Sequence, residues 1–198
     1  MSSWRDYLPK KRPMGFIAAC LVSLVVAVFY PSDLASYREN LNAERPFWVE
    51  PTETKLRFVN TLAQVAMPLL LRDKEGMVQL LTLAVTATVA TQGLKRIVDD
   101  VHIGGTRLGE RPYAPDSRHN MPSGHSSMSS CAVYFVARRY GLWHLLYLLP
   151  ILLLTMGARL MLDAHTLSAV LAGCLIGIIC AAWFTSPYRK KKPEETTA

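Results

Sequence analysis

Charged residues are scarce in this chain, and they are clustered rather than evenly spread. Only 19% of the 198 residues are Asp, Glu, Lys or Arg, and 51% are hydrophobic, whereas soluble domains carry about 25% charged residues. Long stretches without a charge lie between the clusters, at 14–30, 76–94, 143–158 and 166–186. A helix needs about 17–25 apolar residues to cross the hydrocarbon core of a bilayer. The scarcity of charge therefore predicts a membrane protein, with residues 1–198 forming a single membrane-embedded domain.

Cysteines are few, and none of them is arranged to bind a metal or to form a disulfide framework. All four lie within apolar segments, at Cys20, Cys131, Cys174 and Cys180, and no two of them form a C-x-x-C pair. This pattern excludes the common zinc motifs. We expect these side chains to pack as small hydrophobic groups between helices.

The chain also lacks a small-residue cleavage site after its first apolar stretch. Basic residues 10–12 precede that stretch, as they would in a secretory signal peptide, but no A-x-A pattern follows Tyr30. We therefore interpret the segment as an uncleaved membrane anchor.

The remaining pattern predicts an all-α fold, a polytopic bundle of six transmembrane helices. The spans are expected at 14–30, 57–71, 76–94, 123–137, 142–159 and 166–186. The second is the least regular, because it contains Asn60, Gln64 and Pro68. No internal repeat is visible.

The net charge of +7 comes from clusters that flank the spans. Basic residues at 10–12, 72–74, 138–139 and 189–192 all fall on one side if the N-terminus is inside. Such clusters typically face the cytoplasm and anionic headgroups, so we predict a bilayer as the partner and no nucleic acid. The segments outside the bilayer are then a cytoplasmic N-terminus 1–13, two outer segments 31–56 and 95–122, and a cytoplasmic tail 187–198. We expect an amphipathic or irregular cap in the first outer segment, and a loop rich in glycine and proline in the second.

The alternation of the spans brings distant polar residues to one face. The third span ends on the face where the fourth begins, and the fifth ends on the face where the sixth begins. Residues 95–118, 123–125 and 159–165 must therefore lie on the same side of the membrane, whatever happens in the first two spans.

The residues gathered in this way suit an anionic phosphate. They include the cations Lys95, Arg96, Arg111 and Arg159, with His125 and His165. Guanidinium and ammonium groups bind phosphate oxygens. Pro122-Ser123-Gly124-His125 opens an apolar run, and Ser123 is a candidate N-cap that would leave the Gly124 and His125 amides facing an anion.

Two histidines in such a setting predict phosphoryl transfer. One neutral imidazole would attack phosphorus, while the other, protonated, would donate to the departing alkoxide. The sequence contains nothing that resembles a metal–carboxylate cluster, so we predict no metal and no cofactor. Each residue alone has a simpler interpretation, because interfacial histidines and snorkelling arginines are common in membrane proteins. The combination on one face favours the enzymatic interpretation.

At these residues the chain resembles the type 2 phosphatidic-acid phosphatase superfamily. The resemblance covers about 85–186 and the six-span layout, and it rests on Lys95 with Arg111-Pro112, then on Pro122-Ser123-Gly124-His125, then on Arg159 with His165. It implies His165 as the nucleophile and His125 as the general acid. It also implies that Lys95, Arg111, Ser123, Gly124 and Arg159 bind the phosphoryl group.

Two departures from the family pattern concern Lys95 and the partner of His165. The family places its lysine seven residues before the Arg-Pro pair, but position 104 is glycine, so we infer an insertion and keep Arg96 as a rival. The family also has an aspartate four residues after the nucleophile, where this chain has Ala169. Asp163 is the candidate to orient the imidazole instead if the chain folds back before the sixth span, with Ser168 as a weaker alternative. Either the orienting role has moved or the activity is reduced.

Within the superfamily, the stretches 108–113, 120–128 and 162–166 are most similar to the lipid A 1-phosphatases of Gram-negative inner membranes. That likeness implies a multi-pass protein of the bacterial inner membrane with its site facing the periplasm, and lipid A 1-phosphate as the substrate. Undecaprenyl pyrophosphate, phosphatidylglycerophosphate and transfer to a second lipid stay open as alternatives, as does a non-catalytic membrane protein. No obligate protein partner is predicted.

Overall fold

The computed structural model describes residues 4–30, 32–39 and 44–188 as an almost entirely helical bundle. Residues 1–3, 31, 40–43 and 189–198 lie outside the described residues. They include most of the predicted cytoplasmic tail and its basic cluster at 189–192.

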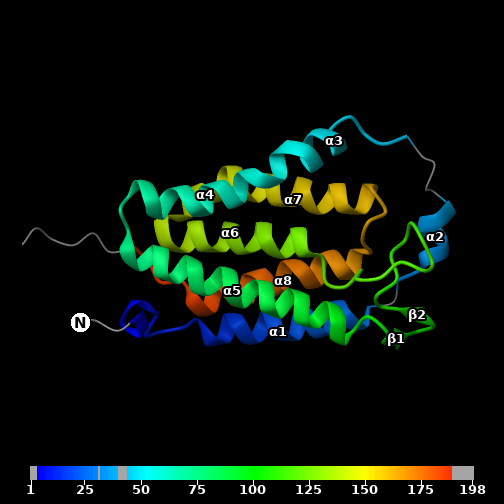
Figure 1. Ribbon diagram of the computed structural model, residues 1–198, viewed down its shortest axis with the longest axis horizontal. Helices are drawn as coiled ribbons and strands as arrows, with labels where there is room; N and C mark the ends of the chain where they lie inside the picture. The colour runs from blue at the N-terminus through cyan, green and yellow to red at the C-terminus, as the bar shows by residue number, and fades with distance from the viewer. Residues whose placement is uncertain (1–3, 31, 40–43, 189–198) are drawn as a thin grey trace, which may run out of the picture.

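Long helices occupy all six predicted spans. They are α1 (Met14–Phe29), α4 (Arg57–Leu70), α5 (Lys74–Ile97), α6 (Gly124–Tyr140), α7 (Leu145–Met161) and α8 (Leu167–Phe184). They run along the long axis of the molecule, side by side (Figure 1). By length and hydropathy, three helical stretches suffice to cross a membrane, 74–97, 142–161 and 167–184, and α1 is a shorter apolar helix.

The segments between these helices are more ordered than the sequence predicts. Within the predicted cap are α2 (Leu34–Glu39) and α3 (Val49–Pro51), and a π-helical stretch (Thr52–Leu56) joins α3 to α4 without a break. The predicted loop 95–122 begins only after α5 ends at Ile97, and it contains the hairpin β1 (His102–Ile103) and β2 (Thr106–Arg107). Gly104 and Gly105 form the turn of the hairpin with positive φ, a backbone conformation that glycine adopts without strain.

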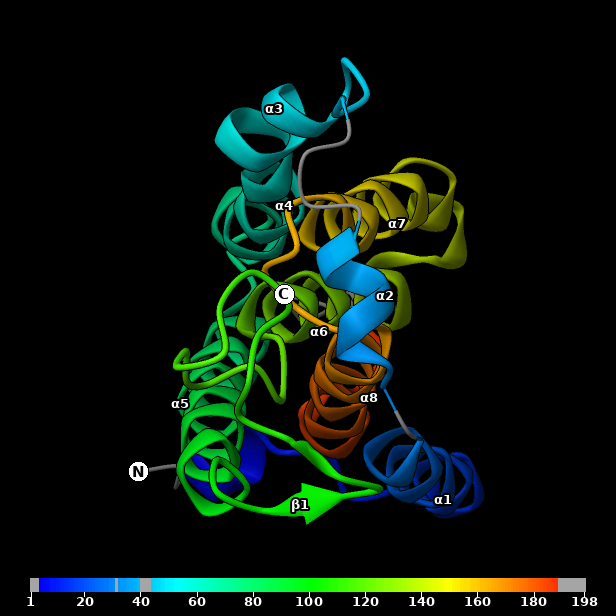
Figure 2. The ribbon, with the colours of Figure 1, turned by 90° about the vertical axis from the view of Figure 1, so that its right-hand side faces the viewer.

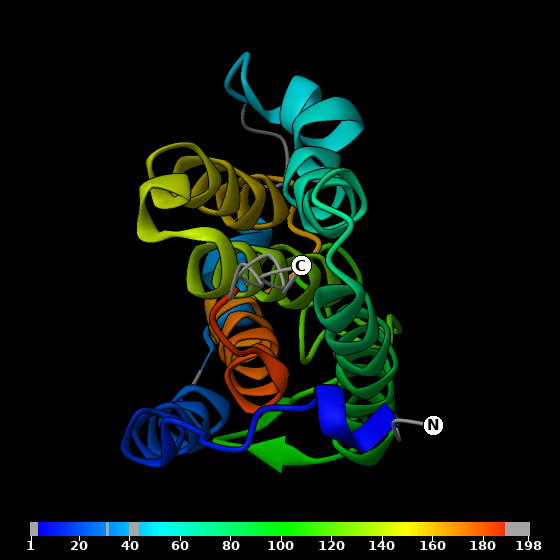
Figure 3. The same ribbon diagram turned by 90° about the vertical axis from the view of Figure 1, so that its left-hand side faces the viewer.

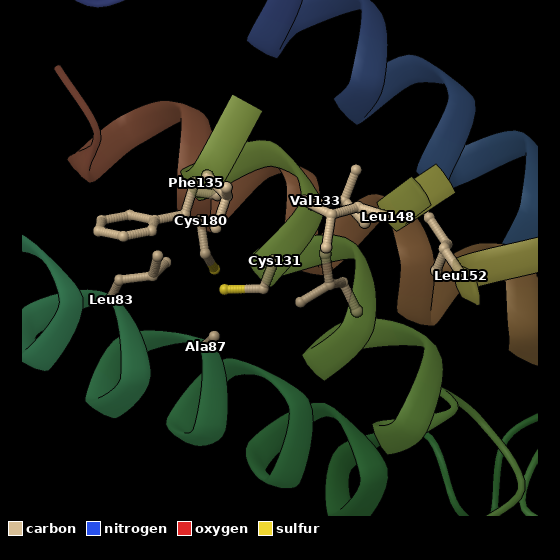
Figure 4. Close-up of a cluster of buried hydrophobic side chains, with 11 residues drawn as sticks. Leu83, Ala87, Cys131, Val133, Phe135, Leu148, Leu152 and Cys180 are labelled. Carbon is tan, nitrogen blue, oxygen red and sulfur yellow. The ribbon is translucent and has the colours of Figure 1, made fainter. Parts of the chain in front are cut away.

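Helix α6 lies at the centre of the bundle, packed against α4, α5, α7 and α8, while α1 packs on the outside of α8 (Figure 2). The main apolar core lies around its second half, where Cys131 and Phe135 contact Leu83 of α5 and Cys180 of α8 (Figure 4). All four cysteines are free thiols, and Cys131, Cys174 and Cys180 belong to this apolar core.

Small residues allow α6 and α8 to approach closely. A Cβ on Gly173 would lie 2.2 Å from the Ser123 carbonyl oxygen, and one on Gly177 would lie 2.2 Å from the Ser127 carbonyl oxygen. Glycines four residues apart are a common device for close helix packing in membranes. Here they bring the start of α6 beside the start of α8, where a backbone hydrogen bond joins Ser123 N to Ala169 O at 2.9 Å.

The opposite end of the bundle is closed by a buried polar network around Arg139. Its guanidinium donates to Asp73 and Gln79 and to the backbone of Ser186, so it joins the α4–α5 turn, α6 and the end of α8. The short 3₁₀ turn Trp4–Tyr7 meets α5 at the same end through a bond from Gln79 to the Tyr7 carbonyl (Figure 3). Every donor of this buried cation therefore has an acceptor close by.

Candidate active site

A cavity of about 650 Å³ opens at the end of the bundle where α5 and α7 finish and α6 and α8 begin. Six of the predicted site residues line it, Lys95, Arg111, Gly124, His125, Arg159 and His165. The structure thus brings residues from the three separate regions together around one cavity.

His165 lies in the turn between α7 and α8, with only 2% of its surface exposed. Its Nδ1 lies 2.7 Å from the Asn120 carbonyl oxygen, which can only accept a hydrogen bond. Nδ1 therefore carries the proton, and Nε2 keeps its lone pair. Burial, followed by the charges of Arg159, Lys95 and Arg111, lowers the pKa of His165 well below its usual value of about 6.5. The imidazole is therefore neutral at physiological pH, with a free lone pair on Nε2.

Asn120 fixes this turn with its side chain as well as its carbonyl. Its Oδ1 accepts from Thr166 N at 3.1 Å, and its Nδ2 donates to Thr166 Oγ1 at 3.1 Å. Thr166 is the N-cap of α8 and accepts from Ala169 N. His165 is thus held between a capped helix and an asparagine that bonds both to its ring and to Thr166.

Asp163 does not take the orienting role that the sequence predicts. Among the described contacts its carboxylate makes no hydrogen bond with His165, and burial raises its pKa while nearby Arg45 lowers it. A positive φ of 53° at Asp163 helps reverse the chain just before His165. Ser168 bonds to Thr166 Oγ1 instead.

Ala169 stands where the family has its aspartate, and it is fully buried beside Leu108 and Met121. The Asn120 carbonyl fills the role that Asp163 was expected to fill.

Lys95, not Arg96, faces the cavity. Lys95 is 8% exposed and its Nζ donates to the His119 carbonyl at 2.8 Å, whereas Arg96 is exposed and bonds to the backbone of its own helix. Arg111 reaches the same carbonyl from the loop, with Nη2 at 3.4 Å, and bonds to the Arg118 carbonyl. Despite the inferred loop insertion, Lys95 and Arg111 therefore meet at the His119 carbonyl.

The loop that carries Arg111 is organised by Asp99, which sequence reasoning missed. Its buried carboxylate accepts from His119 N at 2.7 Å and pairs with Arg118, and its carbonyl accepts from Gly109 N at 3.1 Å. Burial would raise the pKa of Asp99, but the hydrogen bond from His119 N and the charge of Arg118 outweigh it and lower that pKa. Asp99 is ionised and acts as the centre around which the loop folds.

The start of α6 behaves as the sequence predicts, with one difference. Ser123 is the N-cap, and its hydroxyl accepts from Ser126 N at 3.5 Å and from Ser126 Oγ at 3.1 Å. The Ser123 side chain is fully buried and does not line the cavity, whereas Gly124 and His125 do. Ser123 therefore supports the helix end, and the open N-terminus with Gly124 faces the ligand space.

A second set of charges, from the π-helical stretch and α4, completes the site. Glu53 Oε1 accepts from Arg159 Nη1 at 2.8 Å and from Arg57 Nη1 at 2.5 Å. Arg57 Nη1 also lies 2.9 Å from His125 Nε2. An arginine can only donate, so His125 Nε2 accepts and is unprotonated in this state. Neither Glu53 nor Arg57 was foreseen, although an i,i+4 acidic–basic pair just before a polar span was a signal that could have drawn attention.

The site has room and cations for a tetrahedral anion beside the neutral imidazole of His165. Among the described residues no group of three or more His, Cys, Asp or Glu side chains is arranged to hold a metal. A membrane-helix bundle with two histidines, a lysine and several arginines around one cavity defines the class as a membrane-bound enzyme that acts on phosphate esters.

Comparison with known proteins places the chain within this class. The PAP2 superfamily model matches residues 14–193, and the chain belongs to the PAP2 superfamily. Two relatives from Helicobacter pylori strains are lipid A 1-phosphatases. The relative from strain J99 is 41% identical to this chain over 92% of each of the two chains. The relative from strain 26695 is 40% identical over 95% of this chain and 94% of the relative. A Helicobacter pylori lipid A 4'-phosphatase is 33% identical over 68% of this chain.

The fold also matches a solved structure, the transmembrane PAP2-type phosphatidylglycerolphosphate phosphatase from Bacillus subtilis. The TM-score is 0.58 at 16% sequence identity, over 83% of this chain and 91% of that one. The family model and the two lipid A 1-phosphatases confirm the resemblance that the sequence motifs carry. The chain is a multi-pass membrane lipid phosphatase.

Proposed function

We propose that this protein removes the 1-phosphate of lipid A, without a metal ion, through a phosphohistidine intermediate on His165. The observation that carries the proposal is the state of that imidazole, which is neutral and tied at Nδ1 to the Asn120 carbonyl beside a cluster of cations. The two lipid A 1-phosphatases, similar over more than nine-tenths of the chain, support the choice of lipid.

In the first step His165 Nε2 attacks phosphorus, and the bond from phosphorus to the sugar oxygen breaks. Lys95, Arg111 and Arg159 stabilise charge on the other phosphoryl oxygens. His125 gives its proton to the departing oxygen. In the second step water attacks the phosphohistidine, His125 takes a proton from that water, and the P–N bond breaks to release phosphate and the free imidazole.

The contact between Arg57 and His125 sets a condition on this sequence. His125 cannot donate a proton from Nε2 while that nitrogen accepts from Arg57 at 2.9 Å. A phosphate that enters the cavity offers Arg57 a stronger acceptor, which frees His125 to be protonated. Substrate binding and activation of the general acid are thereby coupled.

The shape of the cavity supports a lipid substrate. From the polar end it continues between α4 and α5 as far as Leu80, a distance of about 20 Å along α5 at ~1.5 Å per residue. Several residues at its lower end are apolar, including Val65, Leu80, Leu81 and Ala84. A cavity that is cationic at one end and apolar at the other matches a membrane lipid, which has a phosphate at one end and hydrocarbon at the other.

We further propose that all six long helices span the bacterial inner membrane, with the active site in the periplasm. Basic residues 72, 74, 138 and 139 lie at the end opposite the site, where the cytoplasm is expected. A membrane-impermeant maleimide applied to spheroplasts should label Tyr113→Cys, at the site end, and not Leu142→Cys, at the other end. Both positions are exposed, and the native cysteines are covered or half-buried. The reverse labelling would contradict the orientation.

The test of function compares two lipids on protein purified in mild detergent with a chelator present. We expect wild type to release phosphate from lipid A in preference to undecaprenyl pyrophosphate, and His165→Ala to release none. A preference for the prenyl pyrophosphate would assign the protein to that lipid instead. Phosphate that appears on an added acceptor lipid rather than in solution would indicate a phosphotransferase, and full activity in His165→Ala would contradict the mechanism.

A further inference from the structure

Polar side chains line the middle of the groove between α4 and α5, below the phosphate site. Thr61 and Gln64 lie on α4, and Thr88 and Thr91 lie on α5. Arg57 to Gln64 and Lys95 to Thr88 are both seven residues, so Gln64 and Thr88 lie about 10 Å from the cationic end. The groove therefore has three zones, a cationic end, a polar middle and an apolar lower part.

Several of these groups have hydrogen-bonding capacity that the protein does not use. Thr61 Oγ1 is buried with no partner. Gln64 is 6% exposed, and its amide has one long contact, 3.7 Å to the Cys131 thiol. Thr88 takes part in none of the hydrogen bonds formed among the described residues, whereas Thr91 is paired with Ser127 Oγ at 3.0 Å.

Other threonines of α5 show that this is not a general feature of the helix. Thr82 and Thr86 donate to the carbonyls four residues earlier, at 2.9 and 2.7 Å, and neither lines the groove. Hydroxyls within a bilayer normally satisfy themselves in this way, because water is absent there. The free groups are concentrated where a ligand would lie.

We propose that the polar middle of the groove recognises an amide-linked acyl sugar, so that it selects an N-acylated sugar phosphate over a lipid with a plain hydrocarbon tail. This inference rests on the proposed function. An amide-linked acyl group supplies one N–H donor and one carbonyl acceptor where the ligand passes from the cationic end into the groove, and the Gln64 side chain offers both partners. A prenyl chain supplies neither, and it would leave Gln64 and Thr61 unsatisfied at a cost in binding.

Buried polar side chains in the groove allow the protein to discriminate between polar and apolar ligands. A site built to hydrogen-bond a ligand rejects analogues that lack the bonding group, because its own buried polar atoms are then left unpaired. Gln64 and Thr61 are therefore specificity-determining residues and take no part in the chemical step.

The experiment measures kcat/KM on lipid A and on undecaprenyl pyrophosphate for wild type, Gln64→Leu, Thr88→Val and the matched control Thr86→Val. We expect the ratio of lipid A to prenyl pyrophosphate to fall about tenfold in Gln64→Leu, the loss of one hydrogen bond to a buried group. Thr88→Val, which keeps its shape and lies at an exposed position, should lower the ratio in the same direction. Thr86→Val should keep the wild-type ratio.

The possible outcomes separate this inference from the proposed function. If both groove variants keep the wild-type ratio while wild type still prefers lipid A, recognition by the polar middle is contradicted and the proposed function stands. If wild type releases no phosphate from lipid A, the proposed function and this inference fail together.

Discussion

At the residue scale, the orientation of His165 depends on a backbone carbonyl. Nδ1–H donates to the Asn120 carbonyl, and the Asn120 side chain ties that residue to Thr166 at the start of α8. A carbonyl fixes the same tautomer as a carboxylate but carries no full charge. The imidazolium form of His165 is therefore less stabilised than in a histidine–aspartate pair, and this keeps the ring neutral.

Substitution of Asn120 should therefore reduce turnover and substitution of Asp163 should not, although the sequence pattern favours Asp163 as the orienting residue. We expect Asn120→Ala to lower kcat about 10- to 100-fold, because the turn that aligns the nucleophile loses both side-chain bonds. Asp163→Asn should keep turnover within about twofold of wild type, since its carboxylate makes no bond to His165. Steady-state kinetics on lipid A would measure both. A large loss in Asp163→Asn with an active Asn120→Ala would restore the carboxylate as the orienting group.

The pKa of His165 predicts how stability depends on pH. Because the folded state holds this pKa below about 6.5, the unfolded chain binds a proton that the folded chain does not as pH falls through that value. The full free energy of unfolding is therefore present above about pH 6.5. Below that pH the titration of His165 lowers it by up to about 1.4 kcal/mol for each pH unit.

The check is thermal unfolding in detergent at several pH values for wild type and His165→Asn. We expect Tm of wild type to fall as the pH is lowered below about 6.5, and a shallower fall in the variant. Equal slopes would mean that His165 is protonated in the folded protein.

The carboxylate of Glu53 lies among the arginines of the site. It accepts from both Arg159 and Arg57, so a negative charge lies next to the place where the substrate phosphate is proposed to bind. We expect Glu53→Gln to lower the concentration of inorganic phosphate that half-inhibits the enzyme by about tenfold, since a competing negative charge is removed. Glu50→Gln, one turn earlier and exposed, is the matched control. Weaker inhibition by phosphate in Glu53→Gln would show that Glu53 mainly positions the arginines.

At the scale of elements, the approach of α6 to α8 brings the two histidines together. Gly173 faces the Ser123 carbonyl, which leaves no room for a side chain. Pushing the helices apart would displace His125 relative to His165. His125 lies two residues after Ser123, and His165 lies four residues before Ala169, whose carbonyl accepts from Ser123 N. The close packing of two helices therefore controls the geometry of the site.

Two alanine substitutions test this packing. Gly173→Ala should lower Tm and reduce kcat about tenfold or more, because the added Cβ overlaps backbone that cannot move aside. Gly93→Ala lies in α5 with no atom within 4 Å of the new Cβ, and it should leave Tm unchanged or slightly raised. Similar effects of the two variants on kcat would contradict a role for the α6–α8 contact.

At the scale of the whole molecule, the two ends of the bundle are built on different principles. The site end holds cations with unused capacity around a cavity, whereas the opposite end satisfies a buried cation completely. Arg139 has 1% of its side chain exposed and bonds to Asp73 by two nitrogens. The burial of Asp73 would raise its pKa, but the bonds from Arg139 and Gly76 lower it, so the carboxylate is ionised.

Removal of one partner from this pair should be more damaging than removal of both. We expect Arg139→Leu to destabilise the protein by about 3–5 kcal/mol, because the Asp73 charge is left buried and unpaired. The double variant Arg139→Leu, Asp73→Leu should recover part of that loss, and unfolding in detergent would measure both. A neutral single variant would mean that water reaches Asp73.

The sequence by itself determined the class of protein and the residues at the centre of the chemistry. Hydrophobic run length predicts membrane helices because the bilayer thickness is fixed, and the six predicted segments match the helices to within a few residues. Alternation of the spans then places His125, Arg159 and His165 at one end, since that argument depends only on the order of helices along the chain.

Only the tertiary structure decided what surrounds these residues. The Asn120 carbonyl that orients His165 has no sequence signature, because every residue has a carbonyl. Glu53 and Arg159 are 106 positions apart, and whether they pair depends on how α4 leans against α7. Lys95 and Arg96 are adjacent and chemically similar, and the rotation of α5 places one in the cavity and the other outside. Local patterns fix which segments are helices, but the rotation, tilt and packing of those helices arise from contacts between distant parts of the chain.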